Sequence, residues 1–274
     1  MSTIKHTADT HVPYVLREER DGVVTLTLNQ PRRFNPLSEA MLSSLSQHLD
    51  AVSADPDVRV VVLAAQGPAF CAGHDLREMR AQPSQQYYKA LFAQCTQVML
   101  GIVNCRVPVI ARVQGLATAA GCQLVATCDL AVAADTARFA VSGVTLGLFC
   151  SNPSIALAAN VPRKQAFEML FTGEFIDAPT ALRYGLVNRT GPSHLLDAMV
   201  QELCSSITRH PPVAVQTGKR MFYHQHRQSI EDAYSYAGDV MACNMMEHDT
   251  LEGVQAFLDK REPHWPHRGE RLTV

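Results

Sequence analysis

Hydrophobic residues in the first part of the chain follow first the spacing of strands and then that of a helix. Residues 14–28 contain the β-branched run V-V-T-L-T-L and the turn Arg20-Asp21-Gly22, which together predict a hairpin. Residues 38–52 carry apolar side chains on one helical face, behind a serine that can cap the helix. Residues 58–63 are an unbroken apolar run, which predicts a strand buried on both faces.

The alternation of helix and strand continues, with a helix expected over 84–103 and a second over 119–126. Strands are expected over 107–113 and 129–134. Buried strands that alternate with helices imply parallel pairing, so the predicted class is α/β. Helical spacing dominates the rest of the chain, over residues 163–171, 179–184, 193–208, 212–224, 229–246 and 250–261. We therefore predict three parts, namely a flexible N-terminal arm (1–13), a core (14–205) and a helical C-terminal region (206–274).

Composition and charge limit the classes of molecule that the chain is expected to bind. The chain is 47% hydrophobic and 18% charged, the balance of a globular protein with a large core. A net charge of −2 gives no basic surface for nucleic acid, and the apolar runs are shorter than the roughly 20 residues that span a bilayer. The eight cysteines form no CxxC pair, and no signal peptide is evident, so reduced thiols are expected. The expected location is the cytoplasm for a bacterial protein, or the mitochondrial matrix for a processed eukaryotic one.

Two segments place small residues where a strand turns into a helix. In the first, F-C-A-G-H-D-L-R-E-M, Asp75 and Glu78 have the spacing of a capping box, so a helix should start near Leu76. In the second, Q-G-L-A-T-A-A-G-C-Q-L, small side chains let backbone N–H groups approach a ligand. Free N–H groups at two helix starts could together hold a developing oxyanion such as a thioester enolate. Taken singly, each segment is equally consistent with ordinary packing.

Taken together, the two segments resemble the crotonase family of enoyl-CoA hydratases and isomerases. The pattern is F-x-A-G-x-D-L, a helix, and then P-V-I-A-x-V-x-G-x-A-x-x-x-G-C, and the likeness extends over residues 14–265. It implies an α/β spiral of ββα units, followed by a helical C-terminal region that mediates trimerisation. It further implies an acyl-CoA substrate, a homotrimer or a dimer of trimers, no metal, and no cofactor beyond the coenzyme A of the substrate.

The resemblance also implies roles for particular residues. The backbone N–H groups of His74 and Ala120 would hold the thioester oxygen. Arg77 stands where relatives often carry a lysine near the coenzyme A phosphates, although a solvated charge on a helix face explains it equally well. Residues implied in coenzyme A binding are Ala72, His74, Asp75, Leu76 and Arg77, with Lys260 on the last helix as a weaker candidate.

The chain departs from the family pattern where protons are moved. Hydratases of the family carry one glutamate directly after the Gly-Cys pair and another twenty residues later, and here these positions are Gln123 and Gly143. An amide can orient water but cannot exchange a proton near neutral pH, and glycine has no side chain. Hydration of a short 2-enoyl-CoA is therefore expected to be absent or very slow. Glutamates at both positions should restore it if the loops keep the geometry of a hydratase.

Substitutes for the missing carboxylates are few. Cys150 and Ser151 lie in a loop from which some relatives send an aspartate toward the substrate, but a nucleophilic cysteine needs a base. A buried core thiol is the ordinary alternative for Cys150. The imidazole of His74 could act as an acid or base, or could be a loop histidine with no chemical role. Asp129 and Asp135 flank a strand and are interpreted as structural.

Three classes of function are consistent with a member of this family. The first is a lyase or isomerase that acts on an acyl-CoA enolate in fatty-acid metabolism with unusual acid–base groups. The second is a non-catalytic acyl-CoA-binding or assembly protein. RNA binding, known for one branch with a lysine-rich helix, is set aside because Lys89 is the only basic residue of the helix at 84–103. The motifs G-H-D-L, A-A-G-C-Q-L and G-L-F-C-S resemble one subgroup of the family that shares both replacements.

Overall fold

The computed structural model describes residues 12–265, so most of the predicted N-terminal arm and the last nine residues lie outside it. The chain begins with the predicted hairpin, in which β1 (Val15–Arg20) pairs antiparallel with β2 (Val23–Leu28). Asp21 (φ 51°) and Gly22 (φ 75°) form the turn, both in the left-handed region. Two successive residues with positive φ match the twist of the two strands, which is why an Asp-Gly pair closes this hairpin.

The hairpin extends a larger sheet whose other strands are parallel. The sheet has six strands in the order β1-β2-β3-β5-β7-β10, and every pair from β2 onward is parallel. The further strands are β3 (Val60–Ala65), β5 (Val109–Val113), β7 (Leu130–Ala134) and β10 (Arg189–Gly191). All of β3 is buried, as the apolar run predicted. The α/β class expected from the sequence is confirmed.

A second sheet of very short strands was not predicted. Its order is β4-β6-β8-β9, and its members are β4 (Ala69–Cys71), β6 (Leu116–Thr118), β8 (Arg138–Ala140) and β9 (Ile176–Asp177). Strands of two or three residues are too short to show a period-2 pattern, so the sequence carries no signal for them. Each of the first three follows a strand of the main sheet and precedes a helix. This repeat is the spiral of ββα units that the resemblance implied.

Helices surround the two sheets. In chain order they are η1 (Pro31–Arg33), α1 (Glu39–Ala54), α2 (Leu76–Ala81), α3 (Gln85–Asn104), α4 (Ala120–Thr127), η2 (Ser142–Leu146), α5 (Ser151–Asn160), α6 (Arg163–Thr172), α7 (Ala178–Arg183), η3 (Ser193–Leu195) and α8 (Leu196–Thr208). The hydroxyl of Ser38 caps α1 as predicted, accepting a hydrogen bond from the N–H of Met41. The expected loop at Cys150 and Ser151 is wrong, because Ser151 begins α5. Pro153 in the first turn of α5 suits a helix start.

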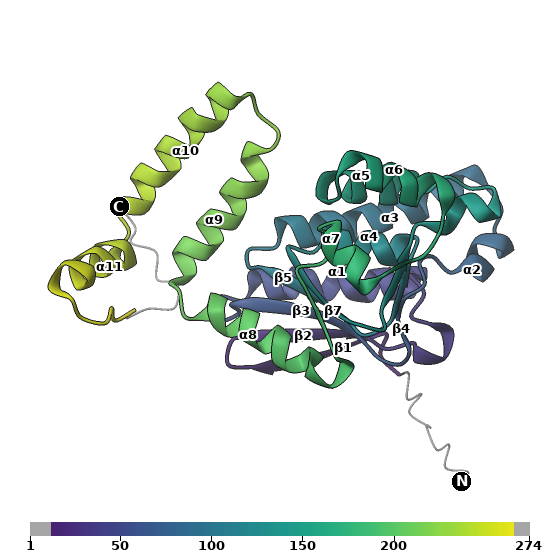
Figure 1. Cartoon of the computed structure of the whole chain (residues 1–274), viewed down its shortest axis with the longest axis horizontal. Coiled ribbons are helices and arrows are strands. Elements are labelled where there is room, and N and C mark those ends of the chain that lie inside the picture. Colours follow the sequence, from purple (N-terminus) through teal and green to yellow (C-terminus); the bar gives the residue numbers. More distant parts are fainter. Residues whose placement is uncertain (1–11, 266–274) are drawn as a thin grey trace, which may run out of the picture.

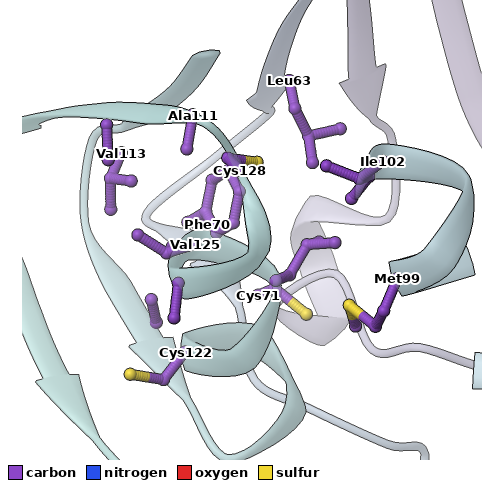
Figure 2. Close-up of a cluster of buried hydrophobic side chains, with 14 of the residues drawn as sticks. Leu63, Phe70, Cys71, Met99, Ile102, Ala111, Val113, Cys122, Val125 and Cys128 are labelled. Atoms are coloured by element: carbon purple, nitrogen blue, oxygen red, sulfur yellow. The ribbon is translucent and has the colours of Figure 1, made fainter. Parts of the chain in front are cut away.

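One large hydrophobic core fills the space between the main sheet, the second sheet and the helices. Phe70 lies in it among Ala111, Val125 and Cys128, all buried (Figure 2). A smaller cluster on the other face of the main sheet includes Val200 of α8. Since α8 continues to Thr208, the boundary expected between residues 205 and 206 falls inside this helix.

The C-terminal helices lean away from the core (Figure 1). They are α9 (Pro212–Gln225), α10 (Ile230–Met245) and α11 (His248–Asp259). No residue of α10 is buried. Large apolar side chains exposed on these three helices and their connections, which we call the C-terminal arm, are Phe222, Ile230, Tyr234, Met241, Met245, Met246, Leu251, Val254, Phe257 and Leu258. No helix within residues 12–265 combines the length and the hydropathy that crossing a membrane requires.

A buried ion pair joins the C-terminal arm to the core. The ammonium group of Lys219 on α9 lies 2.7 Å from the carboxylate of Asp129, which also accepts a hydrogen bond from the hydroxyl of Tyr223 at 2.8 Å. The same carboxylate accepts from the backbone N–H of Val109 at 2.6 Å. All of these contacts are structural, in agreement with the interpretation of Asp129 from the sequence.

Candidate functional site

The first glycine-containing segment forms a sharp loop between β4 and α2. Gly73 has φ +90°, a conformation that favours glycine. Its carbonyl oxygen accepts a hydrogen bond of 2.8 Å from the N–H of Leu37, and Leu37 and His74 form an isolated β-bridge. The N–H of Ala72 donates to the carbonyl of Phe34 at 3.0 Å. The loop is thus held by the segment that precedes α1.

Asp75 ends this loop as the N-cap of α2. One carboxylate oxygen accepts from the N–H of Arg77 at 3.0 Å, and the other pairs with the guanidinium of Arg33. The predicted capping box is only half formed, because the carboxylate of Glu78 accepts from the N–H of Glu39 instead. Asp75 therefore positions the loop and is buried, and its pairing with Arg33 has no local signal in the sequence.

The second segment turns directly from β6 into α4. Ala119 holds φ 51° and ψ −121°, and its N–H donates to the carbonyl of Ala140 at 3.0 Å. Ala120 is the first residue of α4, so its N–H has no partner within the helix. Gly121 packs against β4 so closely that an added Cβ would lie 2.0 Å from the carbonyl oxygen of Cys71. Only glycine permits this approach.

The two segments meet at Gly73. A Cβ added to this residue would lie 3.0 Å from the Cβ of Ala119 and 3.2 Å from the backbone nitrogen of Ala120. The structure therefore brings the loop that carries His74 against the start of α4. Within residues 12–265, neither the N–H of His74 nor that of Ala120 donates a hydrogen bond to the protein. Both donors remain free for a ligand.

The imidazole of His74 is fixed on two sides. Its Nδ1 lies 3.3 Å from the carbonyl oxygen of Leu37, and its ring meets Phe92 edge-on, with centroids 5.4 Å apart. Burial lowers the pKa of His74, and the hydrogen bond to Leu37 offsets this only in part. A carbonyl oxygen only accepts, so the neutral ring carries its proton on Nδ1 and presents Nε2 as an acceptor. Phe92 and its packing on His74 were not predicted.

Gln123 lies on α4, three residues after Ala120. The residue is 6% exposed, and its side-chain oxygen Oε1 is buried with no hydrogen-bond partner among the described residues. Its backbone groups are satisfied, since its N–H donates to Ala119 and its carbonyl accepts from the hydroxyl of Thr127. Residues three apart on a helix share one side, so Gln123 and Ala120 are neighbours on the helix surface.

Gly143, where the resemblance implies the second glutamate, is closed off by the loop that follows it. A Cβ added to Gly143 would lie 2.4 Å from the carbonyl oxygen of Leu148 and 2.5 Å from the sulfur of Cys150. The N–H of Leu148 donates to the carbonyl of Gly143 at 3.0 Å, which holds the loop down. The condition attached to installing glutamates, a retained hydratase geometry, is therefore not met at Gly143, since any side chain there displaces the loop.

Cys150 is a buried thiol beside Gly143. Burial raises its pKa, although a hydrogen bond from the backbone of Gly143 offsets part of the change. A neighbouring thiol, Cys122, has its pKa raised to about 12 by burial and, to a lesser degree, by Cys150. No hydrogen bond within the described chain joins Cys150 to a histidine or carboxylate. Ser151 is exposed, and its hydroxyl contacts only the carbonyl of Phe149, at 3.5 Å. Among residues 12–265, neither side chain is hydrogen-bonded to a group that could act as its base.

The residues assigned to coenzyme A binding are only partly brought together. Leu76 and Arg77 are exposed at the start of α2, beside the buried Asp75. Lys260 follows α11, and α11 and α2 lie at opposite ends of the long axis of the molecule (Figure 1). Within one chain, Lys260 is therefore remote from this site. Over residues 12–265, no group of three His, Cys, Asp or Glu side chains is placed to hold a metal ion.

Comparison with known proteins gives matches over most of the chain. Residues 18–268 match the enoyl-CoA hydratase/isomerase family. The mitochondrial enoyl-CoA hydratase domain-containing protein 3 of Mus musculus is 45% identical over 249 residues, which are 91% of this chain and 83% of the relative. An enoyl-CoA hydratase structure from Mycobacterium smegmatis is 58% identical with a TM-score of 0.92, covering 93% of this chain and 99% of its own.

The human enoyl coenzyme A hydratase domain-containing protein 3 also has a solved structure. It is 43% identical, with a TM-score of 0.89, and the match covers 92% of this chain and 100% of the human one. The subgroup that the motifs resemble is that of enoyl-CoA hydratase domain-containing protein 3, and these matches confirm both the resemblance and the crotonase fold. The chain belongs to the enoyl-CoA hydratase/isomerase family.

Proposed function

We propose that this protein binds coenzyme A thioesters and polarises their carbonyl group through the backbone N–H groups of His74 and Ala120. The observation that carries the proposal is the contact of Gly73 with the start of α4, which holds these two free donors close together. Donors fixed before the substrate arrives stabilise a developing oxyanion without reorganising, and removal of one such donor typically lowers the rate about 10²- to 10³-fold. The ligand class also fits a family of CoA-thioester enzymes.

The reaction best supported is a lyase or isomerase step on an acyl-CoA of fatty-acid metabolism, through an enolate held at these donors. Gln123 and Gly143 supply no acid or base, so ordinary hydration is slow in this proposal. The neutral Nε2 of His74 is the first candidate for a proton acceptor, because burial lowers the pKa of the imidazole and leaves the ring unprotonated, although the same shift makes it a weaker base. Cys150 is the weaker candidate, since burial raises its pKa and no base contacts it.

A second candidate function is a non-catalytic acyl-CoA-binding or assembly protein. Two observations favour it, namely the loop that fills the space beside Gly143 and the unpaired amide oxygen of Gln123. In this version the oxyanion donors serve only to bind the thioester. Turnover distinguishes the two candidates, whereas thioester binding is common to both.

The assembly proposed is a homotrimer or a dimer of trimers. It is supported by the exposed apolar side chains of the C-terminal arm, among them Met241, Met246 and Phe257, which a second copy would cover. Light scattering at micromolar concentration tests this directly, and a stable monomer would contradict it. The proposed location is the bacterial cytoplasm, or the mitochondrial matrix if the source is eukaryotic.

Ala120→Pro tests the central claim. Proline at the first residue of a helix removes one N–H without interrupting the helix, and Arg163→Pro removes the corresponding N–H of α6 as a control. Because Ala119 (φ 51°, ψ −121°) suits a following proline less well than Pro162 (ψ 143°), urea denaturation of both variants accompanies the binding measurements. We expect calorimetry to show acyl-CoA binding by the unmodified protein and by the control. A bound cinnamoyl-CoA should absorb at longer wavelength in both, because its carbonyl is polarised, and Ala120→Pro should lose most of this shift. Absence of acyl-CoA binding by the unmodified protein would overturn the proposal.

A further inference from the structure

A cavity of about 920 Å³ lies between the core and the C-terminal arm. Its core wall contains the carboxyl ends of α1 and α3, at Ala54 and Asn104, and its other wall is one face of α9. Residues 103–106 on the core wall precede β5, so the cavity lies at the amino ends of the parallel strands. The segments of His74 and Ala120 follow the carboxyl ends of β3 and β5, at the opposite edge of the main sheet. The cavity is therefore separate from the candidate site.

The cations on the core side of this cavity already have partners. The guanidinium of Arg106 donates to the backbone carbonyls of Ser53, Asp55 and Val58, at and just after the end of α1. The ammonium of Lys219 belongs to the buried ion pair described above and also donates to a carbonyl in the last turn of α3. Carbonyls at the end of a helix carry partial negative charge, so these two cations neutralise both helix ends.

Two arginines on α9 have no such partners. Arg220 and Arg227 line the cavity two helical turns apart, with His224 between them on the same face. Within residues 12–265, neither guanidinium forms a hydrogen bond or an ion pair, and both side chains are exposed to solvent. Positive charge on this face of α9 is therefore available to a ligand.

The two free guanidinium groups favour phosphate over carboxylate as a partner. A guanidinium binds either anion through two parallel hydrogen bonds. A phosphate group carries about 1.5–2 negative charges near pH 7 and has three acceptor oxygens, whereas a carboxylate carries one charge. The axial rise from Arg220 to Arg227 is about 10.5 Å, which suits two linked phosphate groups better than one.

The rest of the lining suits a nucleoside. Glu247, between α10 and α11, places a carboxylate on the cavity, and its side chain does not cap α11. A carboxylate accepts hydrogen bonds from the hydroxyl groups of a ribose, but it repels an anion that has no hydroxyl to donate. Val103, Cys105 and Val213 add apolar surface for a base. The volume falls within the roughly 300–1,000 Å³ of small-molecule sites.

We propose that this cavity binds a nucleoside diphosphate, with the phosphates at Arg220 and Arg227 and the ribose hydroxyls at Glu247. The site does not depend on the proposed function, because it shares no residue with the oxyanion donors. Its lining comes from α9 and the connection between α10 and α11 on one side and from the ends of α1 and α3 on the other. A bound ligand therefore joins the C-terminal arm to the core.

Calorimetry with ADP, adenosine and pyrophosphate tests the ligand class. The full chain is titrated without divalent cations, so that the phosphates meet the arginines directly. We expect ADP to bind at least about tenfold more tightly than adenosine or pyrophosphate, because each of these keeps only part of the charge-assisted hydrogen bonds. Equal binding of pyrophosphate and ADP would reveal a site for an inorganic anion and would overturn the proposal.

Arginine variants test the location. Arg220→Gln and Arg227→Gln remove a charge from exposed positions, so the fold should be unchanged, which circular dichroism checks. We expect each variant to weaken ADP binding at least about tenfold. Arg77→Gln makes the same change in the candidate coenzyme A site and should keep ADP binding within about twofold. The opposite pattern would place ADP in that site and would overturn the proposal.

Glu247→Ala separates recognition of the ribose from attraction of charge. We expect ADP binding to weaken about fivefold, because the hydroxyl groups lose their acceptor. Pyrophosphate binding should stay the same or become tighter, because a repelling charge is removed. Tighter binding of both ligands would show that Glu247 acts only through its charge, and it would overturn the assignment of the ribose.

Two further outcomes would overturn the proposal. The first is the absence of ADP binding by the unmodified protein. The second is a change in the molar mass of Arg220→Gln or Arg227→Gln, measured by light scattering without ADP, since a second copy of the chain would then occupy the cavity. Thioester binding is measured separately, so none of these results bears on the proposed function.

Discussion

The candidate site has two parts, one that depends on backbone groups and one that depends on side chains. One side consists of main chain, where the loop at Gly73 meets the start of α4 and leaves the N–H groups of His74 and Ala120 free. The other side depends on side chains, and there Gln123 offers an amide while Gly143 offers nothing. Backbone donors survive most substitutions, whereas proton transfer is lost with a single side chain. Under the proposed function, the polarisation of a carbonyl and the transfer of a proton therefore depend on different parts of the chain.

The two sides also differ in how they are held. On the main-chain side, Gly121 sits directly on the carbonyl of Cys71, so the close packing creates the site. On the side-chain side, close packing removes space, because the carbonyl of Leu148 and the sulfur of Cys150 occupy the room that a side chain of Gly143 would need. Close contact with a backbone carbonyl therefore positions the start of α4 at Gly121, whereas at Gly143 it leaves no room for a side chain.

The largest expected effect is on hydration. We expect the unmodified protein to hydrate crotonyl-CoA very slowly or not at all, because each positioned acid or base contributes about 10²- to 10⁴-fold and neither Gln123 nor Gly143 supplies one. Loss of the enoyl absorbance measures the rate, with a glutamate-containing hydratase of the family assayed beside it. Turnover comparable with that enzyme would contradict the claim that this chain lacks an efficient acid or base beside the backbone donors. His74→Gln and Cys150→Ser would then identify the residue that moves the proton.

A substitution on the main-chain side should be the most damaging to stability. In Gly121→Val the new side chain collides with the carbonyl of Cys71, and we expect the free energy of unfolding to fall by about 3 kcal/mol, with loss of acyl-CoA binding. Urea denaturation measures the first effect and calorimetry the second. Gly238→Ala on α10 is the control, since an added Cβ there has no atom within 4 Å, and it should gain about 0.5–1 kcal/mol. Equal stability of Gly121→Val and Gly238→Ala would show that Gly121 is not packed tightly against the carbonyl of Cys71.

A side chain introduced at Gly143 should lower the stability less than Gly121→Val does, and it should not restore hydration. We expect Gly143→Glu to lower the free energy of unfolding by about 2 kcal/mol, because the loop from Leu148 to Cys150 must move. Hydration should not rise, even in the double variant with Gln123→Glu. Gly147→Ala, in the same loop, has open space around its Cβ and should lose only about 1 kcal/mol from its positive φ. Efficient hydration by the double variant would show that the loop yields easily.

The smallest expected effect is a pH dependence of stability that comes from His74. Burial lowers its pKa in the folded protein below the ordinary 6.5, so between the two values the unfolded chain binds more protons. Stability should therefore fall as the pH drops below about 6.5, with a slope of at most about 1.4 kcal/mol per pH unit, and should gain nothing above it. Urea denaturation between about pH 5 and 7.5 should show a shallower slope in His74→Gln. The exposed His248→Gln should keep the slope of the unmodified protein.

Features that depend on a few neighbouring residues could be predicted from the sequence alone. The Asp21-Gly22 turn, the cap at Ser38 and the buried strand β3 follow from local conformational preference and from short-range periodicity, and the structure contains all three. The motif pair around His74 and Ala120 was likewise visible, because its glycines and alanines stand at fixed offsets from predicted strands. The positions of Gln123 and Gly143 could be located in the same way, from their spacing relative to the Gly-Cys pair of the motif.

Contacts between distant residues, and the space around them, could not be predicted in this way, because they depend on how the whole chain packs. No local pattern of residues predicts three features of the structure. These are the short strands of the second sheet, the start of α5 at Ser151, and the ion pair of Asp75 with Arg33. Whether a side chain fits at Gly143, or whether Oε1 of Gln123 finds a donor, depends on backbone packed from distant parts of the chain. Close packing specifies such contacts to fractions of an ångström, while residue patterns specify only which face is buried.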